Sequence, residues 1–114
     1  MDHNESVNEI LNHHVEALLH GDVAEILRDY NESSLIYTPE GPVHGLVNLE
    51  VLFTSFLTGL PAGALDEFEI LRCDIYENTA YILWHAGAAI PLGTDTYLIR
   101  NNKIEMQSFA AYMP

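Results

Sequence analysis

Apolar and polar residues repeat with a helical period at the start of the chain. Over residues 6–20, apolar side chains recur every three or four positions, and polar side chains occupy the opposite side. This spacing predicts an amphipathic helix. Gly21 ends the helix, and Asp22 is a suitable N-cap for a second, shorter helix that ends near Tyr30 and Asn31.

The middle of the chain changes from short extended runs to a long helix. Residues 34–38 are β-prone, and Pro39 ends this run because proline has no N–H to donate to a neighbouring strand. Residues 41–45 are interpreted as a second short strand between two glycines. Residues 46–60 predict a third helix, whose wide apolar side consists of Leu46, Leu49, Leu52, Phe53, Phe56, Leu57 and Leu60.

After a Pro-Ala-Gly break the period of the pattern falls to two. β-branched and aromatic residues alternate with other residues in four runs, at positions 68–76, 80–90, 94–100 and 103–112. Turn residues separate these runs at positions 77–78, 91–93 and 101–102. Helices followed by an antiparallel meander predict an α+β fold, with the helices against one face of a curved sheet.

The composition limits the classes of protein to consider. Hydrophobic residues make up 48% of the 114 residues, enough for one domain with a single core. Seventeen acidic residues against four basic ones give a net charge of −13, which repels nucleic acid and anionic membranes, so neither is an expected partner. The single cysteine, Cys73, has no partner for an internal disulfide. No apolar run approaches about 20 residues and no signal peptide is recognised, so we expect a cytoplasmic protein.

The order of these elements resembles the nuclear transport factor 2-like superfamily, which includes SnoaL-like polyketide cyclases, scytalone dehydratase and ketosteroid isomerases. The segments that carry the resemblance are HHVEALLHGDVAEILRDY, LIYTPEGPVHG and GTDTYLIRNNKIEMQSFAAY. It implies a single SnoaL-like domain over residues 1–114, with three N-terminal helices packed in a cone against a strongly bent, mainly antiparallel sheet. This cystatin-like fold encloses an apolar pocket, and its members commonly form homodimers through the outer face of the sheet.

His14 is a candidate for chemistry because it lies in the apolar stripe of the first helix, whereas His13 and His20 lie on the polar side. A buried imidazole needs a partner or stays neutral. It is either a core histidine satisfied by a carbonyl or a water, or a pocket residue. The resemblance favours the pocket, because His14 aligns with the helix-borne oxyanion tyrosine of ketosteroid isomerases.

Asp95 and His85 are the other two catalytic candidates. Asp95 shares a strand face with Tyr97, and the resembling isomerases hold a protonated aspartate at the matching position. The alternative for Asp95 is a turn cap or a ligand of backbone amides. If the His85 side of its strand faces the concave side of the sheet, His85 joins Tyr97 and Gln107 in the pocket, and we favour this orientation. In the opposite orientation Trp84 lines the pocket instead.

Gln107 alternates with Glu105 and Phe109 along the last strand, opposite Ile104 and Met106. The resemblance places this register toward the cavity, where an amide orients a ligand well but is a poor acid or base. The alternative is a surface or cross-strand glutamine. The full set of expected ligand-binding residues is Tyr37, Thr38, Phe53, Phe56, Trp84, Tyr97, Gln107 and Phe109, and its aromatic members suit a plain core equally.

The corner IYTPEGPVHG departs from the isomerase pattern. Those enzymes keep their catalytic aspartate directly before the proline, and this chain has Thr38 there. A threonine hydroxyl without a strong neighbour is not a base at neutral pH. We expect Glu40 and His44 to lie in solvent at this turn, so the corner counts against ketosteroid isomerase activity.

A metal site is not expected. His13, Glu16 and His20 share a helix face, but it is the polar one, where histidines are usually solvated, and no second cluster completes the set. There is also no phosphate loop, no G-x-S-x-G elbow and no CxxC motif. We therefore expect no metal and no cofactor.

Two functions remain open. The first is a cofactor-independent isomerase, cyclase or dehydratase that moves a proton on a small apolar carbonyl or polyketide-like substrate. The alternative is a non-catalytic module that binds a small apolar ligand or serves as a dimeric accessory domain. A weaker option is recognition of another protein through the acidic exterior.

Overall fold

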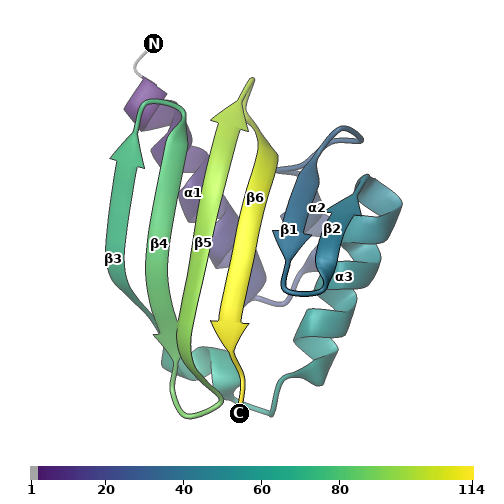
Figure 1. The fold of residues 1–114 in the computed structure, drawn as a ribbon, viewed down its shortest axis with the longest axis vertical. Coiled ribbons are helices and arrows are strands. Elements are labelled where there is room, and N and C mark those ends of the chain that lie inside the picture. The colour runs from purple at the N-terminus through teal and green to yellow at the C-terminus, as the bar shows by residue number, and fades with distance from the viewer. Residues whose placement is uncertain (1–2) are drawn as a thin grey trace.

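The computed structural model describes residues 3–114, with side chains from Ser6 onward, and has the expected α+β architecture (Figure 1). The helices are α1 (His3–Leu19), α2 (Val23–Leu27), α3 (Leu46–Gly59) and the 3-10 helix η1 (Ala64–Glu67). The strands are β1 (Leu35–Thr38), β2 (Gly41–His44), β3 (Phe68–Tyr76), β4 (Thr79–Ala86), β5 (Ile90–Arg100) and β6 (Lys103–Tyr112). No helix among these residues is long and apolar enough to cross a membrane.

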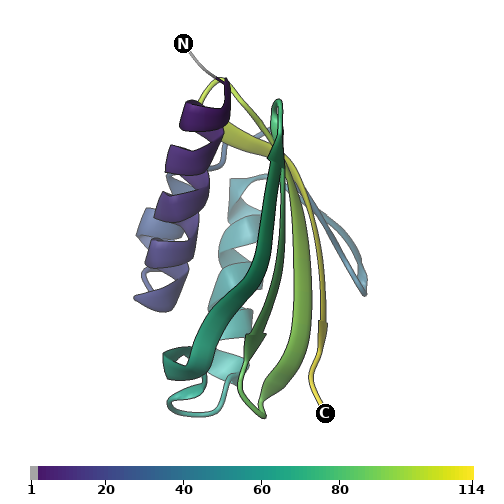
Figure 2. The ribbon, with the colours of Figure 1, turned by 90° about the vertical axis from the view of Figure 1, so that its left-hand side faces the viewer.

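The strands form one open, bent sheet in the order β2-β1-β6-β5-β4-β3. Neighbouring strands are antiparallel except β1 and β6, which run parallel. The α3 and η1 segment carries the chain from the β1–β2 hairpin to the far edge of the sheet, and the meander β3–β6 returns to β1 (Figure 1). The side view shows α1 and α3 on the concave side, whereas none of the described helices covers the other face (Figure 2).

The helices follow from the predicted pattern. The apolar stripe of α1 buries Val7, Leu11 and His14, each 2% exposed. Asp22 caps α2 as expected, because its side chain accepts a hydrogen bond from the Glu25 N–H over 3.1 Å. On α3, Leu49 and Phe53 are buried against the same core. Burial of one face on each helix fixes the layer that lies over the sheet.

The β4–β5 turn lies earlier than the sequence suggested. We expected β4 to continue to Ile90 and a turn at Pro91–Gly93, but β4 ends at Ala86 and the turn occupies residues 87–89. Gly87 permits it with a φ of +60°. Pro91 lies inside β5, ahead of the first paired residue of that strand, so its missing N–H disrupts no ladder bond.

A β-bulge changes the register of β6. Leu98 pairs with Met106 and Ile99 pairs with Ile104, so Glu105 is an extra residue on this strand. As a result Ile104 and Gln107 both face the core, at 0% and 3% exposed. The expectation that Ile104 lies opposite Gln107 was wrong, because simple alternation does not anticipate a bulge.

Candidate functional site

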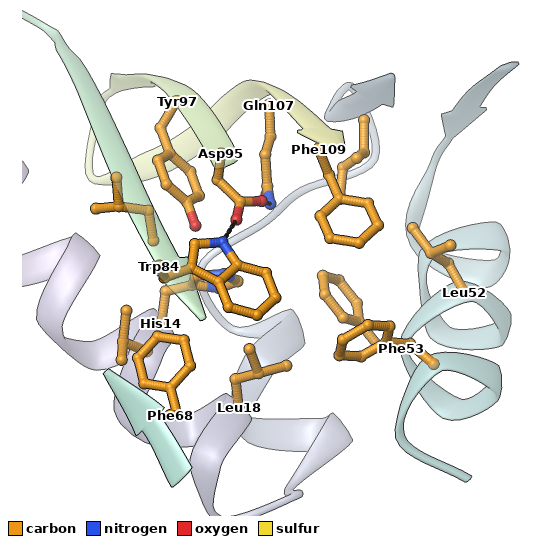
Figure 3. Close-up of a pocket in the computed structure, with 14 residues that line it drawn as sticks. His14, Leu18, Leu52, Phe53, Phe68, Trp84, Asp95, Tyr97, Gln107 and Phe109 are labelled. Carbon is orange, nitrogen blue, oxygen red and sulfur yellow. Dashed lines mark hydrogen bonds between the residues drawn. The ribbon is translucent and has the colours of Figure 1, made fainter. Parts of the chain in front are cut away.

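A pocket lies between the concave face of the sheet and the helices α1 and α3 (Figure 3). It holds about 550 Å³ of empty space when its open mouth is counted. Its polar residues are His14, Asp95, Tyr97 and Gln107, together with the indole of Trp84. The rest of the wall is apolar and consists of Val15, Leu18, Ile36, Leu52, Phe53, Phe56, Phe68, Ile82 and Phe109.

Asp95 projects from β5 into this wall and is held by both neighbouring strands. The Trp84 indole on β4 donates from Nε1 to Oδ2 over 2.7 Å, and the Gln107 amide on β6 donates from Nε2 to Oδ1 over 3.0 Å. The side chain is buried, and burial raises its pKa from 3.8 to about 6 although the two hydrogen bonds act in the opposite direction. Asp95 can therefore gain or lose a proton close to neutral pH.

Tyr30 orients the amide that contacts Asp95. Its buried hydroxyl donates to Gln107 Oε1, which turns the NH₂ group of Gln107 toward the carboxylate. Burial raises the pKa of Tyr30 well above its ordinary value, so the phenol stays protonated and remains a donor. In the sequence, Tyr30 follows the second predicted helix, and no periodic pattern places its side chain in a site.

His14 lines the pocket from α1 as a neutral imidazole. Its ring meets the rings of Tyr30, Phe53 and Tyr97 edge-on, with centroid distances of 5.9, 6.1 and 5.4 Å. Burial, with a smaller effect of the neighbouring His13 charge, lowers the pKa of His14 to about 4. No group among the described residues hydrogen-bonds its buried Nδ1, so the alternative of a core histidine satisfied by a backbone carbonyl is not found at that atom.

The structure brings together most of the residues singled out from the sequence. Both His14 and Asp95 line the pocket, and so do the expected binding residues Phe53, Phe56, Trp84, Tyr97, Gln107 and Phe109. Asp95 lies inside β5, so a turn cap is excluded. Six further lining residues were not expected in the site, namely Val15, Leu18, Ile36, Leu52, Phe68 and Ile82. Of these, Leu18 could have been inferred, because it belongs to the apolar stripe of the first helix.

His85 does not belong to the pocket, which corrects the orientation favoured for β4. Ile82 and Trp84 face inward and are 2% and 3% exposed, so His85 points to the outer face. There its Nδ1 accepts the Gly87 N–H over 3.1 Å, and its Nε2 lies 3.1 Å from Glu69 Oε1. Both faces of β4 carry large apolar side chains, so alternation alone did not distinguish them.

Tyr37 and Thr38 also lie outside the pocket wall. Tyr37 is 50% exposed on β1. The Thr38 hydroxyl donates to the Gly41 carbonyl over 2.8 Å and accepts the Glu40 N–H over 3.1 Å, so it is engaged in the turn. Glu40 and His44 are exposed, as expected.

The polar face of α1 is not simply solvated. His13 Nδ1 lies 2.6 Å from Asp29 Oδ2, and His13 Nε2 lies 2.8 Å from Glu25 Oε1, so this imidazole joins α1 to α2. This corrects the expectation of a solvent-facing histidine. His20 donates to the Glu16 carbonyl instead, and within residues 3–114 no group of three potential ligands could hold a metal ion.

Comparisons with solved structures identify the fold. An NTF-2-like protein of unknown function from Burkholderia xenovorans LB400 has a TM-score of 0.77 at 24% identity, over 98% of this chain and 87% of that one. An NTF2-like protein of unknown function from Mesorhizobium loti has a TM-score of 0.79 at 16% identity, over 98% and 95%.

A SnoaL-like protein from Shewanella denitrificans OS-217, provisionally named a polyketide cyclase, has a TM-score of 0.72 at 13% identity, over 93% of this chain and 90% of that one. At these identities the similarity establishes the fold and not the reaction. No protein-family model and no curated protein matches the sequence.

Proposed function

We propose that this chain, which has the nuclear transport factor 2-like fold, binds a small, mostly apolar molecule in its pocket and that Asp95 exchanges a proton with it. The reaction class is a cofactor-independent isomerisation, cyclisation or dehydration of a small carbonyl or polyketide-like compound. The observation that carries the proposal is the buried carboxyl of Asp95 on an aromatic wall, hydrogen-bonded by Trp84 and Gln107.

The two titratable groups of the pocket suit different roles. The pKa of Asp95, about 6, is close to neutral pH, which is the condition for efficient general acid–base catalysis there. His14, with a pKa of about 4, remains neutral and is a weak base. We therefore assign proton transfer to Asp95 and substrate positioning by hydrogen bonding to His14.

The test is a screen of small carbonyl compounds for exchange of carbon-bound protons with deuterated solvent, followed by NMR. The compared proteins are wild type, Asp95→Asn and the matched control Asp66→Asn, which changes an exposed aspartate in η1 that is not among the residues that line the pocket. We expect exchange in wild type and in the control, and a loss of about 100-fold in Asp95→Asn. Equal exchange in all three proteins would exclude Asp95 as the proton-transfer group.

A non-catalytic binding module is the alternative, and one observation favours it. Both oxygens of Asp95 already accept hydrogen bonds from protein side chains, as the oxygens of a structural carboxylate do. Ligand binding that Asp95→Asn weakens, without deuterium exchange on any compound that binds, would support this alternative.

A further inference from the structure

The charges around the pocket are unbalanced. Asp95 is the one acidic residue among those that line it, and the lining contains no lysine or arginine. The four basic residues of the chain are engaged elsewhere: Arg28 with Glu25, Arg72 with Asp74, Arg100 with Glu105, and Lys103 with the Arg28 carbonyl. Among the residues that the structure describes, an ionised Asp95 therefore has hydrogen-bond donors but no counter-ion.

The walls beside Asp95 are aromatic. Trp84 lies beside Phe68 (Figure 3), with ring centroids 5.4 Å apart. Phe56 packs against Phe109 with centroids 5.8 Å apart. Aromatic faces carry negative electrostatic potential and attract cations, most strongly when water is excluded. The pocket thus combines a negative charge with a polarisable apolar wall.

The three possible charges of a ligand have different consequences here. An anion would meet Asp95 and a protein of net charge −13 with no cation to compensate it. A neutral molecule would fill the apolar space and leave the carboxylate unpaired. A cation would supply the missing counter-ion, and the acidic exterior would raise its local concentration.

We propose that the pocket binds a small alkylammonium group, with Asp95 as its counter-ion and the aromatic side chains around its methyl or methylene groups. This inference rests on the proposed function, because it names the charge of the ligand that the same pocket binds.

Three compounds of nearly the same shape but different charge test which ligand charge the pocket prefers. Choline carries a trimethylammonium group, 3,3-dimethylbutan-1-ol replaces its nitrogen by carbon, and 3,3-dimethylbutanoate carries a negative charge. Calorimetric titration of the full chain at pH 7.5 and low salt measures each affinity. We expect choline to bind about tenfold more tightly than the neutral alcohol, and the carboxylate to bind least.

Two variants distinguish the effect of the Asp95 charge on ligand binding from the effect of the negative net charge of the whole protein. Asp95→Asn and Asp66→Asn remove the same charge, the first in the pocket and the second on the surface. The pocket network can reverse to accommodate the amide, because Gln107 can turn its oxygen toward the new NH₂ group and Tyr30 can accept instead of donate. We expect the preference for choline over the alcohol to disappear in Asp95→Asn and to persist in Asp66→Asn.

The outcomes distinguish this inference from the proposed function. Binding of the alcohol as tightly as choline would overturn the inference and leave the pocket proposal intact. A choline preference that survives Asp95→Asn would also overturn it, because the general field would then be the cause. Failure of all three compounds to bind would overturn the inference, and the deuterium-exchange screen would then decide the proposed function on its own.

Discussion

Trp84 and Asp95 lie on adjacent strands and are joined by a hydrogen bond of 2.7 Å from the indole Nε1 to Oδ2. The bond connects the aromatic wall of the pocket to its carboxyl group. It also opposes the effect of burial on the pKa of Asp95, because it stabilises the ionised form. The two residues therefore set the protonation of the site together.

Replacing the indole tests this relationship. Trp84→Phe removes the donor, so we expect the pKa of Asp95 to rise above 6 because the ionised form loses a hydrogen bond. At pH 8 the variant should also lose about 1–3 kcal/mol of stability. NMR titration of the Asp95 carboxyl carbon and urea unfolding measure the two effects. An unchanged or lower pKa would contradict the role given to Trp84.

Gly93 is the residue on which the Trp84 ring packs. A Cβ at Gly93 would lie 2.4 Å from two carbons of the indole, so Gly93→Ala must displace the ring. We expect Gly93→Ala to lower the free energy of unfolding by about 1–3 kcal/mol, measured by urea unfolding. We also expect it to alter the fluorescence of Trp84, the single tryptophan of the chain.

Gly59→Ala in α3 is the matched control for Gly93→Ala. A Cβ there meets nothing within 4 Å, and alanine favours a helix, so this variant should be neutral or stabilised by up to about 1 kcal/mol. Equal stabilities of the two alanine variants would show that the ring does not depend on Gly93.

The raised pKa of Asp95 makes stability depend on pH in a defined direction. A carboxyl with a folded pKa of about 6 and an unfolded pKa near 3.8 contributes stability that is fully present below pH 3.8 and is lost as the pH rises through 6. The stability of wild type relative to Asp95→Asn should therefore fall by about 3 kcal/mol between pH 3.5 and pH 7.5. Urea unfolding of both proteins across this range gives the difference. A difference that stays constant or grows with pH contradicts a raised pKa.

The His13 bridge between α1 and α2 also makes the stability of the protein fall as the pH rises, but in a higher range of pH than Asp95 does. Both ring nitrogens contact carboxylates, and both can donate only when the imidazole is protonated, so the pKa of His13 is raised. The contribution of His13 is fully present below its ordinary pKa of 6.5 and is lost as the pH rises through the higher folded value.

His13→Ala should therefore destabilise the protein more at pH 6 than at pH 9. His20→Ala is the control, because the His20 ring hydrogen-bonds an uncharged backbone carbonyl, that of Glu16. Thermal unfolding at the two pH values measures the difference, and equal losses at both would contradict a protonated bridge.

We propose that the outer face of the sheet forms a homodimer, because none of the described helices covers it (Figure 2). This face also carries exposed apolar side chains. Leu92 and Tyr112 are cross-strand partners there, at 50% and 62% exposed. Wild type should sediment as a dimer at micromolar concentration, and the double variant Leu92→Lys, Tyr112→Lys as a monomer. Val47→Lys, at a position on α3 that is 73% exposed, should remain dimeric. A wild-type mass near 12.8 kDa would contradict the dimer.

Much of the fold could be predicted from the sequence because two periods are plain in it. The helical period of residues 6–20 and the alternation after Gly63 each reflect burial of one face. The errors occurred where local backbone geometry overrides the pattern, at the left-handed Gly87 and at the extra residue Glu105 in β6. Such features depend on how neighbouring strands pair, and the alternation of residues along one strand carries no information on that pairing.

The site was predictable only in part for a related reason. His14 and Asp95 could be found because each polar residue interrupts an apolar face. Trp84 and His85 are adjacent in a strand with large side chains on both faces, so the sequence did not decide between them. Tyr30 follows a short helix, and only the folded chain brings its hydroxyl to Gln107, which lies 77 positions away.

The most direct test of the central claim is the pKa of Asp95 in the free protein, measured by NMR titration of its carboxyl carbon. A group that exchanges protons with a ligand near neutral pH should titrate with a midpoint near 6. A midpoint for Asp95 at or below 3.8 would mean a permanently ionised, structural carboxylate and would contradict the proposed proton transfer.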